Sequence, residues 1–244
     1  RAAAGRPAVH PWARVLLALW VLAGGAAAPA PAGDAPTRAQ EDLPLEAIAP
    51  GDEGYGLTEG PDGIERFDVE VLARQEASGP GFPTLLVRTG GPFLEDRGGV
   101  AAGMSGSPVY LGAPGEERLA GALAYAFPGG DHRLALVTPI AAMRALTDDD
   151  GGSPEAPGGA APLAAPLLVS GVDARALGHL APLLERAGHR AIPVQGGAGS
   201  PAAAAEGPLA PGAAVAVALA RGDVQVAAIG TVTDVRGEEV LLLG

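Results

Sequence analysis

Gly103-Met104-Ser105-Gly106-Ser107-Pro108 places a serine between two glycines, directly before the strand-like residues 109–111. Small neighbours let a substrate carbonyl approach the serine Oγ and leave backbone N–H groups unobstructed, which is typical of a nucleophile. We expect the amides of Gly103 and Ser105 to form an oxyanion hole. The residues also fit a second interpretation, in which this segment is a glycine-rich turn and its serines only help to form it.

The segment differs from the nucleophile turn of the α/β-hydrolases. That turn follows the pattern Gly-x-Ser-x-Gly, which would require glycine at position 107, where this chain has serine. The segment is therefore a poor match to the α/β-hydrolase turn.

Alternating and apolar segments surround the serine loop. Within residues 64–72, Phe67, Val69 and Val71 share one face and charged residues the other, which predicts a half-buried strand. The strands predicted in this half of the chain cover residues 64–72, 84–88, 108–111 and 119–127. The last two would form a hairpin across the glycine-rich residues 112–117. Short strands separated by glycine turns favour a β-barrel or a β-sandwich.

Helices are expected to be few and peripheral. Thr138 is predicted to cap a helix that begins at Pro139 and ends at Leu146. Residues 173–187 predict a second helix, with an apolar stripe and an internal Pro182. The glycine-rich residues 50–58 are interpreted as turns, and the remaining strands are predicted at 167–169, 213–220, 224–232 and 240–243.

The first 40 residues have the order of a secretory signal followed by a linker. Arginines precede an apolar run, residues 15–22, and small residues with Ala-x-Ala cleavage options follow. The run is too short for a spanning helix, which needs about 20 apolar residues. We therefore expect a secreted or periplasmic protein that touches a membrane only if the signal segment stays uncleaved. Because position 1 is arginine, the sequence is expected to begin inside an open reading frame.

Composition excludes several classes of function. The formal net charge is −12 and the 16 basic residues do not cluster, so no nucleic-acid partner is expected. The chain has no cysteine, which excludes disulfides, thiolate metal sites and a cysteine nucleophile. No cofactor and no metal is expected. The abundance of Ala, Gly, Pro and Arg suggests a GC-rich bacterial genome.

The chain divides into four parts on composition. The signal peptide and linker cover residues 1–40, and a serine-bearing β lobe covers residues 41–147. Residues 148–162, which begin with three aspartates and continue with Gly, Pro and Ala, form a second linker. A second lobe covers residues 163–244.

Several motifs in the same order resemble the SpoIVB-type serine peptidases, named after stage IV sporulation protein B, distant relatives of the chymotrypsin-like peptidases. The resemblance rests on residues 64–72, 98–100, 103–108, 121–125 and 138–140. It implies that Ser105 is the nucleophile of an endopeptidase that cleaves a protein or peptide substrate. The implied fold is a chymotrypsin-like double β-barrel with the site in the cleft between its two lobes.

A serine hydroxyl needs a base, usually histidine, within hydrogen-bond reach. His10 lies in the signal region, His179 and His189 lie on or after a predicted helix, and His132 lies in a turn. In the sporulation peptidase a stretch similar to residues 229–233 leads through a turn and a strand, here residues 240–243, into a Gly-His pair whose histidine is the base. The resemblance therefore implies a histidine directly after Gly244. The chain is then incomplete, and its two lobes come in permuted order relative to the sporulation peptidase.

The third member of a triad is not identified by sequence. The resemblance places an aspartate shortly before the serine motif, but the matching position here is Gly90. Glu95, Asp96 and Asp68 are other carboxylates in this part of the chain. A Ser-His dyad is sufficient for the chemistry, because the carboxylate adds rate by orienting the histidine.

Two other functions remain open at this point. The missing base is compatible with a catalytically inactive β-rich module for binding or scaffolding that keeps the serine loop for its shape. A regulatory protein that cleaves only itself is a further alternative. The given sequence is expected to be nearly inactive under each interpretation, because removing the base of a serine peptidase costs on the order of a million-fold in turnover.

Overall fold

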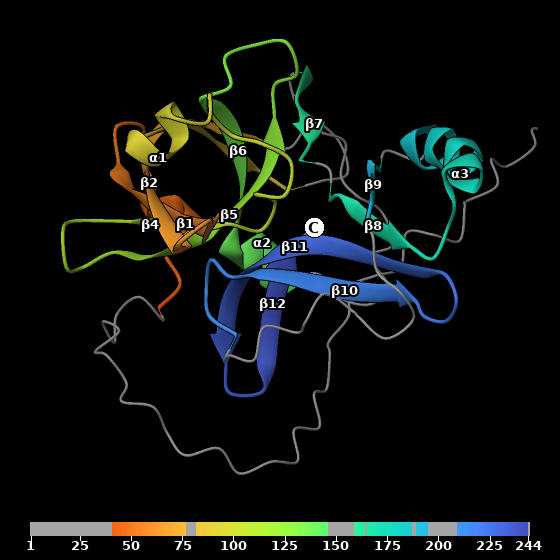
Figure 1. The fold of residues 1–244 in the computed structure, drawn as a ribbon. Helices are drawn as coiled ribbons and strands as arrows, with labels where there is room; N and C mark the ends of the chain where they lie inside the picture. The colour runs from red at the N-terminus through yellow and green to blue at the C-terminus, as the bar shows by residue number, and fades with distance from the viewer. Residues whose placement is uncertain are drawn as a thin grey trace, which may run out of the picture.

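The computed structural model describes residues 41–76, 82–145, 159–163, 165–186, 189–194 and 209–243, and Figure 1 shows their fold. These residues are mainly β, with short helices at the periphery, as expected. Residues 1–40, with the predicted signal segment, lie outside the described residues. None of the helices in the described part is long and apolar enough to span a membrane.

Six antiparallel strands of the first half close into a barrel. They are β1 (Glu53–Gly60), β2 (Gly63–Gln75), β3 (Thr84–Gly90), β4 (Pro108–Leu111), β5 (Arg118–Ala126) and β6 (Leu134–Pro139). Their order is β4-β1-β2-β3-β6-β5, and pairing of β4 with β5 closes the ring. The order β4-β1-β2-β3 is a Greek key. Closure removes the unpaired strand edges that an open sheet would expose.

The barrel core follows the alternation expected from sequence. In β2, Phe67, Val69 and Val71 are buried, whereas Asp68 is exposed. The core also takes in residues from β3, β4, β5 and β6 and from the short helix α1 (Pro92–Glu95), which contributes Leu94. Burial of these aliphatic side chains stabilises the barrel, since each contributes about 1.5–3 kcal/mol when fully removed from water.

Two expectations for this half were wrong. Residues 54–58, interpreted as turns, lie within β1, whose glycines are needed for close approach. A Cβ on Gly54 would lie 1.9 Å from the Tyr110 carbonyl oxygen, and one on Gly56 would lie 2.1 Å from the Phe67 ring. Thr138 does not cap a helix, because it lies buried in β6, and helix α2 (Ile140–Ala145) begins only after Pro139. The ladder bonds of β6 with β5 outweigh the local capping signal there.

The second half forms a separate, open five-stranded sheet. Its strands are β8 (Leu167–Ser170), β9 (Ala191–Pro193), β10 (Ala214–Ala220), β11 (Gln225–Arg236) and β12 (Glu239–Leu243). The order is β10-β11-β8-β9, and β12 also pairs with β11. β8 and β9 are parallel and joined through helix α3 (Ala174–Arg186), whose expected bounds are confirmed within one residue. In the described residues this sheet does not close into a second barrel.

A short segment between the two sheets belongs to the barrel side. Most of the predicted linker 148–162 lies outside the described residues, but its last two residues form β7 (Ala161–Pro162), which pairs with β5. A 3₁₀ helix, η1 (Leu45–Ala47), lies near the start of the described residues. Figure 1 shows β11 beside α2 at the lower side of the barrel, from where it runs toward β8.

The second sheet contacts the barrel where its chain enters β10. Gly212 has φ +89°, and a Cβ there would lie 2.7 Å from the Leu57 Cβ. The Ala214 amide donates a 3.2 Å hydrogen bond to the Glu59 carboxylate. The two sheets are therefore packed directly on each other, with the serine loop at another part of their contact.

Candidate functional site

The serine loop, residues 101–107, is a pair of tight turns between α1 and β4. The Met104 amide donates to the Ala101 carbonyl at 3.2 Å, and the Ser107 amide donates to the Met104 carbonyl at 3.0 Å. Gly103 and Gly106 have φ angles of +96° and +88°. Because residues other than glycine rarely adopt positive φ angles, the two glycines set the shape of the loop on either side of Ser105.

One side of the serine loop is bonded to β5. The Gly106 amide donates to the Leu123 carbonyl at 2.8 Å, and the Leu123 amide donates to the Ser107 carbonyl at 3.0 Å. The loop thus continues the β4–β5 pairing for one more residue pair before it turns away. This pairing fixes the position of the loop relative to β5.

The other side of the loop is bonded to β11 of the second sheet. The Thr231 amide donates to the Ser105 carbonyl at 3.1 Å, and the Thr231 hydroxyl donates to the Gly103 carbonyl at 3.2 Å. The Thr233 hydroxyl donates to the Gly106 carbonyl at 2.8 Å. Three loop carbonyls are therefore held by two threonines, and the serine loop lies in the contact between barrel and second sheet.

Two backbone N–H groups of the serine loop are available as hydrogen-bond donors. Among the described residues no backbone acceptor is bonded to the amides of Gly103 and Ser105, whereas the amide of Gly106 is taken by Leu123. Ser105 itself is only 3% exposed. The nearby Ser107 is fully buried, and its Oγ has no hydrogen-bond partner in the described part of the chain.

The structure brings no histidine to Ser105 within the described ranges. His132 is exposed in the β5–β6 turn, where its carbonyl accepts a hydrogen bond from the Val100 amide at 2.8 Å. His179 lies exposed on α3, and His189 follows that helix and is also exposed. No hydrogen bond from any of these three side chains to Ser105 is present in these ranges. His10 lies outside the described residues.

The carboxylates considered for a triad lie elsewhere on the barrel. Gly90 ends β3 and pairs with Asp68 of β2. Glu95 lies in α1 and lines a hollow of about 390 Å³ together with Gly90, Gly99 and His132. Ser105 does not line this hollow. In the described residues, none of the carboxylates of Asp68, Glu95 and Asp96 is hydrogen-bonded to Ser105.

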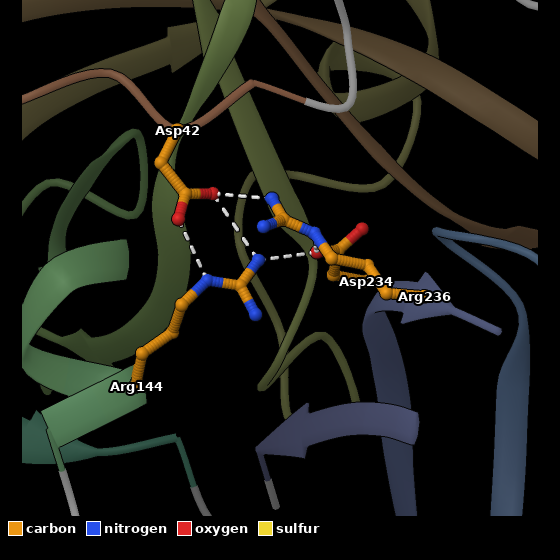
Figure 2. A network of polar contacts seen from close by, with 4 residues as sticks. All are labelled: Asp42, Arg144, Asp234 and Arg236. Carbon is orange, nitrogen blue, oxygen red and sulfur yellow. Dashed lines mark hydrogen bonds and ion pairs between the residues drawn. The ribbon is translucent and has the colours of Figure 1, made fainter. Parts of the chain in front are cut away.

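A network of four charged side chains fixes β11 beside the serine loop (Figure 2). Arg144 of α2 donates to the Asp42 carboxylate at 2.7 and 3.1 Å and also to Asp234 of β11. Arg236 reaches Asp42 at 2.6 Å and Asp234 at 2.8 Å. Asp234 is 4% exposed and follows Thr233 directly, so the network holds the strand segment that bonds the loop.

The charges of the network shift two pKa values. Burial raises the pKa of the Asp42 carboxyl, but hydrogen bonds and charges from Arg144 and Arg236 outweigh burial and hold that pKa below its usual range. Burial lowers the pKa of Arg144, and its bonds to the two aspartates outweigh this and raise it. Both effects favour the ionised pair.

Two tyrosines lie beside this network. The rings of Tyr55 and Tyr110 stack at 5.1 Å, and Arg66 lies 3.9 Å from the centre of the Tyr55 ring. Burial, with Tyr55 and Asp234 nearby, raises the pKa of Tyr110, which keeps its hydroxyl neutral. The sequence does not reveal the network, because Asp42, Arg144 and the β11 pair are far apart along the chain and carry no shared motif.

No family model matches this chain, and no curated protein and no solved structure matches it either. In the described residues, no three His, Cys, Asp or Glu side chains gather in a way that could hold a metal ion.

Proposed function

We propose that this chain is a serine endopeptidase of the sporulation-peptidase type, with Ser105 as its nucleophile. The observation that carries the proposal is the loop geometry. Two glycines with positive φ flank Ser105 one and two residues away, and the amides of Gly103 and Ser105 keep no backbone acceptor in the described part of the chain. Two such amides are what an oxyanion hole requires.

We propose that the histidine base follows Gly244, and the register of β12 supports this position. Leu243 pairs with Thr231, whose amide donates to the Ser105 carbonyl. Two positions further along β11, the Ile229 amide is already bonded to Pro166. The last described residue of β12 therefore lies opposite the residue that bonds Ser105, and this supports a base that follows shortly after it in the sequence.

The proposed reaction is acyl transfer. Ser105 Oγ attacks the carbonyl carbon of a substrate peptide bond while the histidine takes the hydroxyl proton. The resulting oxyanion is held by the Gly103 and Ser105 amides. The histidine then gives the proton to the leaving amine as the C–N bond breaks, and water hydrolyses the acyl-enzyme by the same steps.

The fold and location proposed with this activity follow the same resemblance. We propose that the open second sheet is part of a second barrel, which completes a chymotrypsin-like pair with its lobes in permuted order. The first barrel supports this proposal, because it is a closed Greek key with the serine loop directly before β4. Secretion or export to the periplasm is proposed from residues 1–32 alone.

The test uses the natural protein extended through the codons that follow Gly244. A fluorophosphonate probe, which labels only activated serines, should modify Ser105, and Ser105→Ala should abolish the labelling. Ser107→Ala is the matched control in the same loop and should keep the labelling. An extended chain without a histidine directly after Gly244, or one that stays unlabelled when folded, would contradict the proposal.

A second function is favoured by the burial of Ser105. Ser105 is 3% exposed, and no histidine is bonded to it in the described residues. The serine loop therefore also fits a catalytically inactive β-rich binding or scaffolding module. Its loop would then serve to hold β11 through Thr231 and Thr233. Absence of probe labelling in the extended protein, with an unchanged far-UV circular dichroism spectrum, would select this function.

A further inference from the structure

The edge of β5 beside the serine loop carries two outward carbonyls in succession. Against β6, Leu123 pairs with Val137 and Tyr125 with Leu136, so Ala124 is an extra residue, a β-bulge. Bulges re-aim the backbone locally. As a result the Leu123 carbonyl accepts the Gly106 amide at 2.8 Å, and the next carbonyl, that of Ala124, accepts the Leu163 amide at 2.8 Å.

The chain itself occupies this edge. β7 pairs antiparallel with β5, Ala161 opposite Ala126 and Pro162 opposite Tyr125, and Leu163 follows on Ala124. Leu163 is 6% exposed and belongs to the barrel core. β7 is two residues long and contains a proline, which cannot donate to a ladder, so its backbone pairing is weak for a strand.

The same segment then passes the serine loop. Pro166 is buried, and a Cβ on Gly103 would find its ring carbon at 4.0 Å. The Pro166 carbonyl accepts the Ile229 amide at 3.0 Å. The chain around Leu163 and Pro166 therefore lies between β5 and β11 on the side of the loop that carries Gly103, and Ser105 is covered.

We propose that residues 161–163 are an internal inhibitory strand, which fills the edge of β5 where an extended peptide with an apolar side chain would otherwise bind beside Ser105. The occupant is an extended peptide because this edge of β5 already pairs with an extended segment and gives it the Ala124 carbonyl as an acceptor, which is the basis of recognition by strand addition. Its apolar side chain would take the place of Leu163. The consequence for catalysis rests on the proposed function, whereas the competition for the edge does not.

The strand competes efficiently because it is tethered. A segment of the same chain acts at an effective concentration of roughly millimolar, so a free peptide must bind tightly to displace it. Locking the strand in place should block peptide binding, and expelling Leu163 should strengthen it.

The test uses a reversible lock, since the chain has no cysteine of its own. Ala126→Cys with Ala161→Cys places two thiols at directly paired positions of β5 and β7, where Cβ atoms are about 4.5–5.5 Å apart. Glu70→Cys with Arg88→Cys, paired between β2 and β3, is the matched control. Binding of a fluorescein-labelled peptide copy of residues 160–166 is measured by anisotropy in the oxidised and reduced proteins.

The reduced 126/161 protein should bind this peptide at least tenfold more tightly than its oxidised form, and the control pair should show no difference. Leu163→Asp, which expels the side chain from the core, should bind more tightly than the parent. Equal binding by the oxidised and reduced 126/161 proteins, or no binding by either, overturns the proposal. A peptide with aspartate at the leucine position should not bind, and equal binding of it also overturns the proposal.

Labelling of Ser105 by the fluorophosphonate probe separates this inference from the proposed function. If Ser105 is never labelled but the redox-dependent peptide binding is observed, the peptidase proposal fails and the inhibitory strand stands. If Ser105 is labelled equally in the oxidised and reduced 126/161 proteins and peptide binding does not change, the peptidase proposal stands and the inhibitory strand is wrong.

Discussion

Thr233 holds the serine loop through one hydroxyl. Its side chain is fully buried and donates a 2.8 Å hydrogen bond to the Gly106 carbonyl. Two other buried hydroxyls of the barrel, those of Thr84 and Ser107, have no partner in the described residues. Substitutions at these residues therefore distinguish the stabilisation that a buried hydrogen bond gives from the destabilisation caused by a buried hydroxyl that makes no hydrogen bond.

Replacing Thr233 with valine should lower the free energy of unfolding by about 1–2 kcal/mol, because the Gly106 carbonyl loses its donor while the shape is kept. Thr84→Val removes a hydroxyl that makes no bond, so its effect should be neutral or stabilising. The free energies of unfolding of both variants are measured by urea unfolding, monitored by far-UV circular dichroism. Equal destabilisation by the two substitutions would show that the Thr233 bond contributes nothing.

At the scale of elements, glycines decide how closely the barrel strands approach. Gly121 of β5 lies beside β6, where a Cβ would fall 2.0 Å from the Thr138 carbonyl oxygen. Gly54 of β1 is in the same position toward β4, at 1.9 Å from the Tyr110 carbonyl oxygen. Glycine weakens an isolated strand, but here it permits backbone contact that any side chain would prevent.

Gly121→Ala should therefore destabilise the barrel by about 1–3 kcal/mol, the usual cost of forcing extra atoms into a packed core. Gly178→Ala is the control on α3, where a Cβ would meet no atom within 4 Å. That substitution should stabilise the helix by about 0.5–1 kcal/mol. Thermal unfolding of both variants checks the pair, and a Gly121→Ala protein as stable as the parent would contradict the argument.

At the scale of the whole molecule, the charged network joins three distant segments. Asp42 precedes the barrel, Arg144 lies in the last turn of α2, and Asp234 and Arg236 lie in β11. The Asp42 pKa is lowered, so this carboxylate stabilises the folded state above its unfolded pKa of about 3.9. That stability is lost as the pH falls through the lower, folded-state pKa.

Asp42→Asn should lower the free energy of unfolding at pH 7 by about 1 kcal/mol. The effect is this small because the Asp42–Arg144 ion pair is partly exposed to solvent. The difference from the parent should shrink as the pH falls below about 4, where Asp42 of the unfolded chain takes up a proton while the folded protein still holds the carboxylate ionised. Urea unfolding between pH 7 and pH 3 measures it, with Asp62→Asn in the exposed β1–β2 turn as the control. A difference that is constant over this range would argue against the ionised network.

Local pattern was sufficient for much of the fold and for one part of the site. The alternation of Phe67, Val69 and Val71 identified β2, because a strand buries every second side chain. The β4–β5 hairpin and α3 were also readable from periodicity and turn residues. The serine loop stood out because glycines at positions 103 and 106 permit a backbone that other residues avoid.

The remaining features depend on contacts between residues far apart in the chain. β1 resembles a turn in sequence, and it becomes a strand only because barrel closure brings Tyr110 and Phe67 against its glycines. Arg144 and Asp42 are 102 residues apart, and the β5 edge receives Leu163 from a segment with no strand signal. Side-chain periodicity reports which face of one element is buried, whereas these contacts arise only when the barrel closes and the second sheet packs on it.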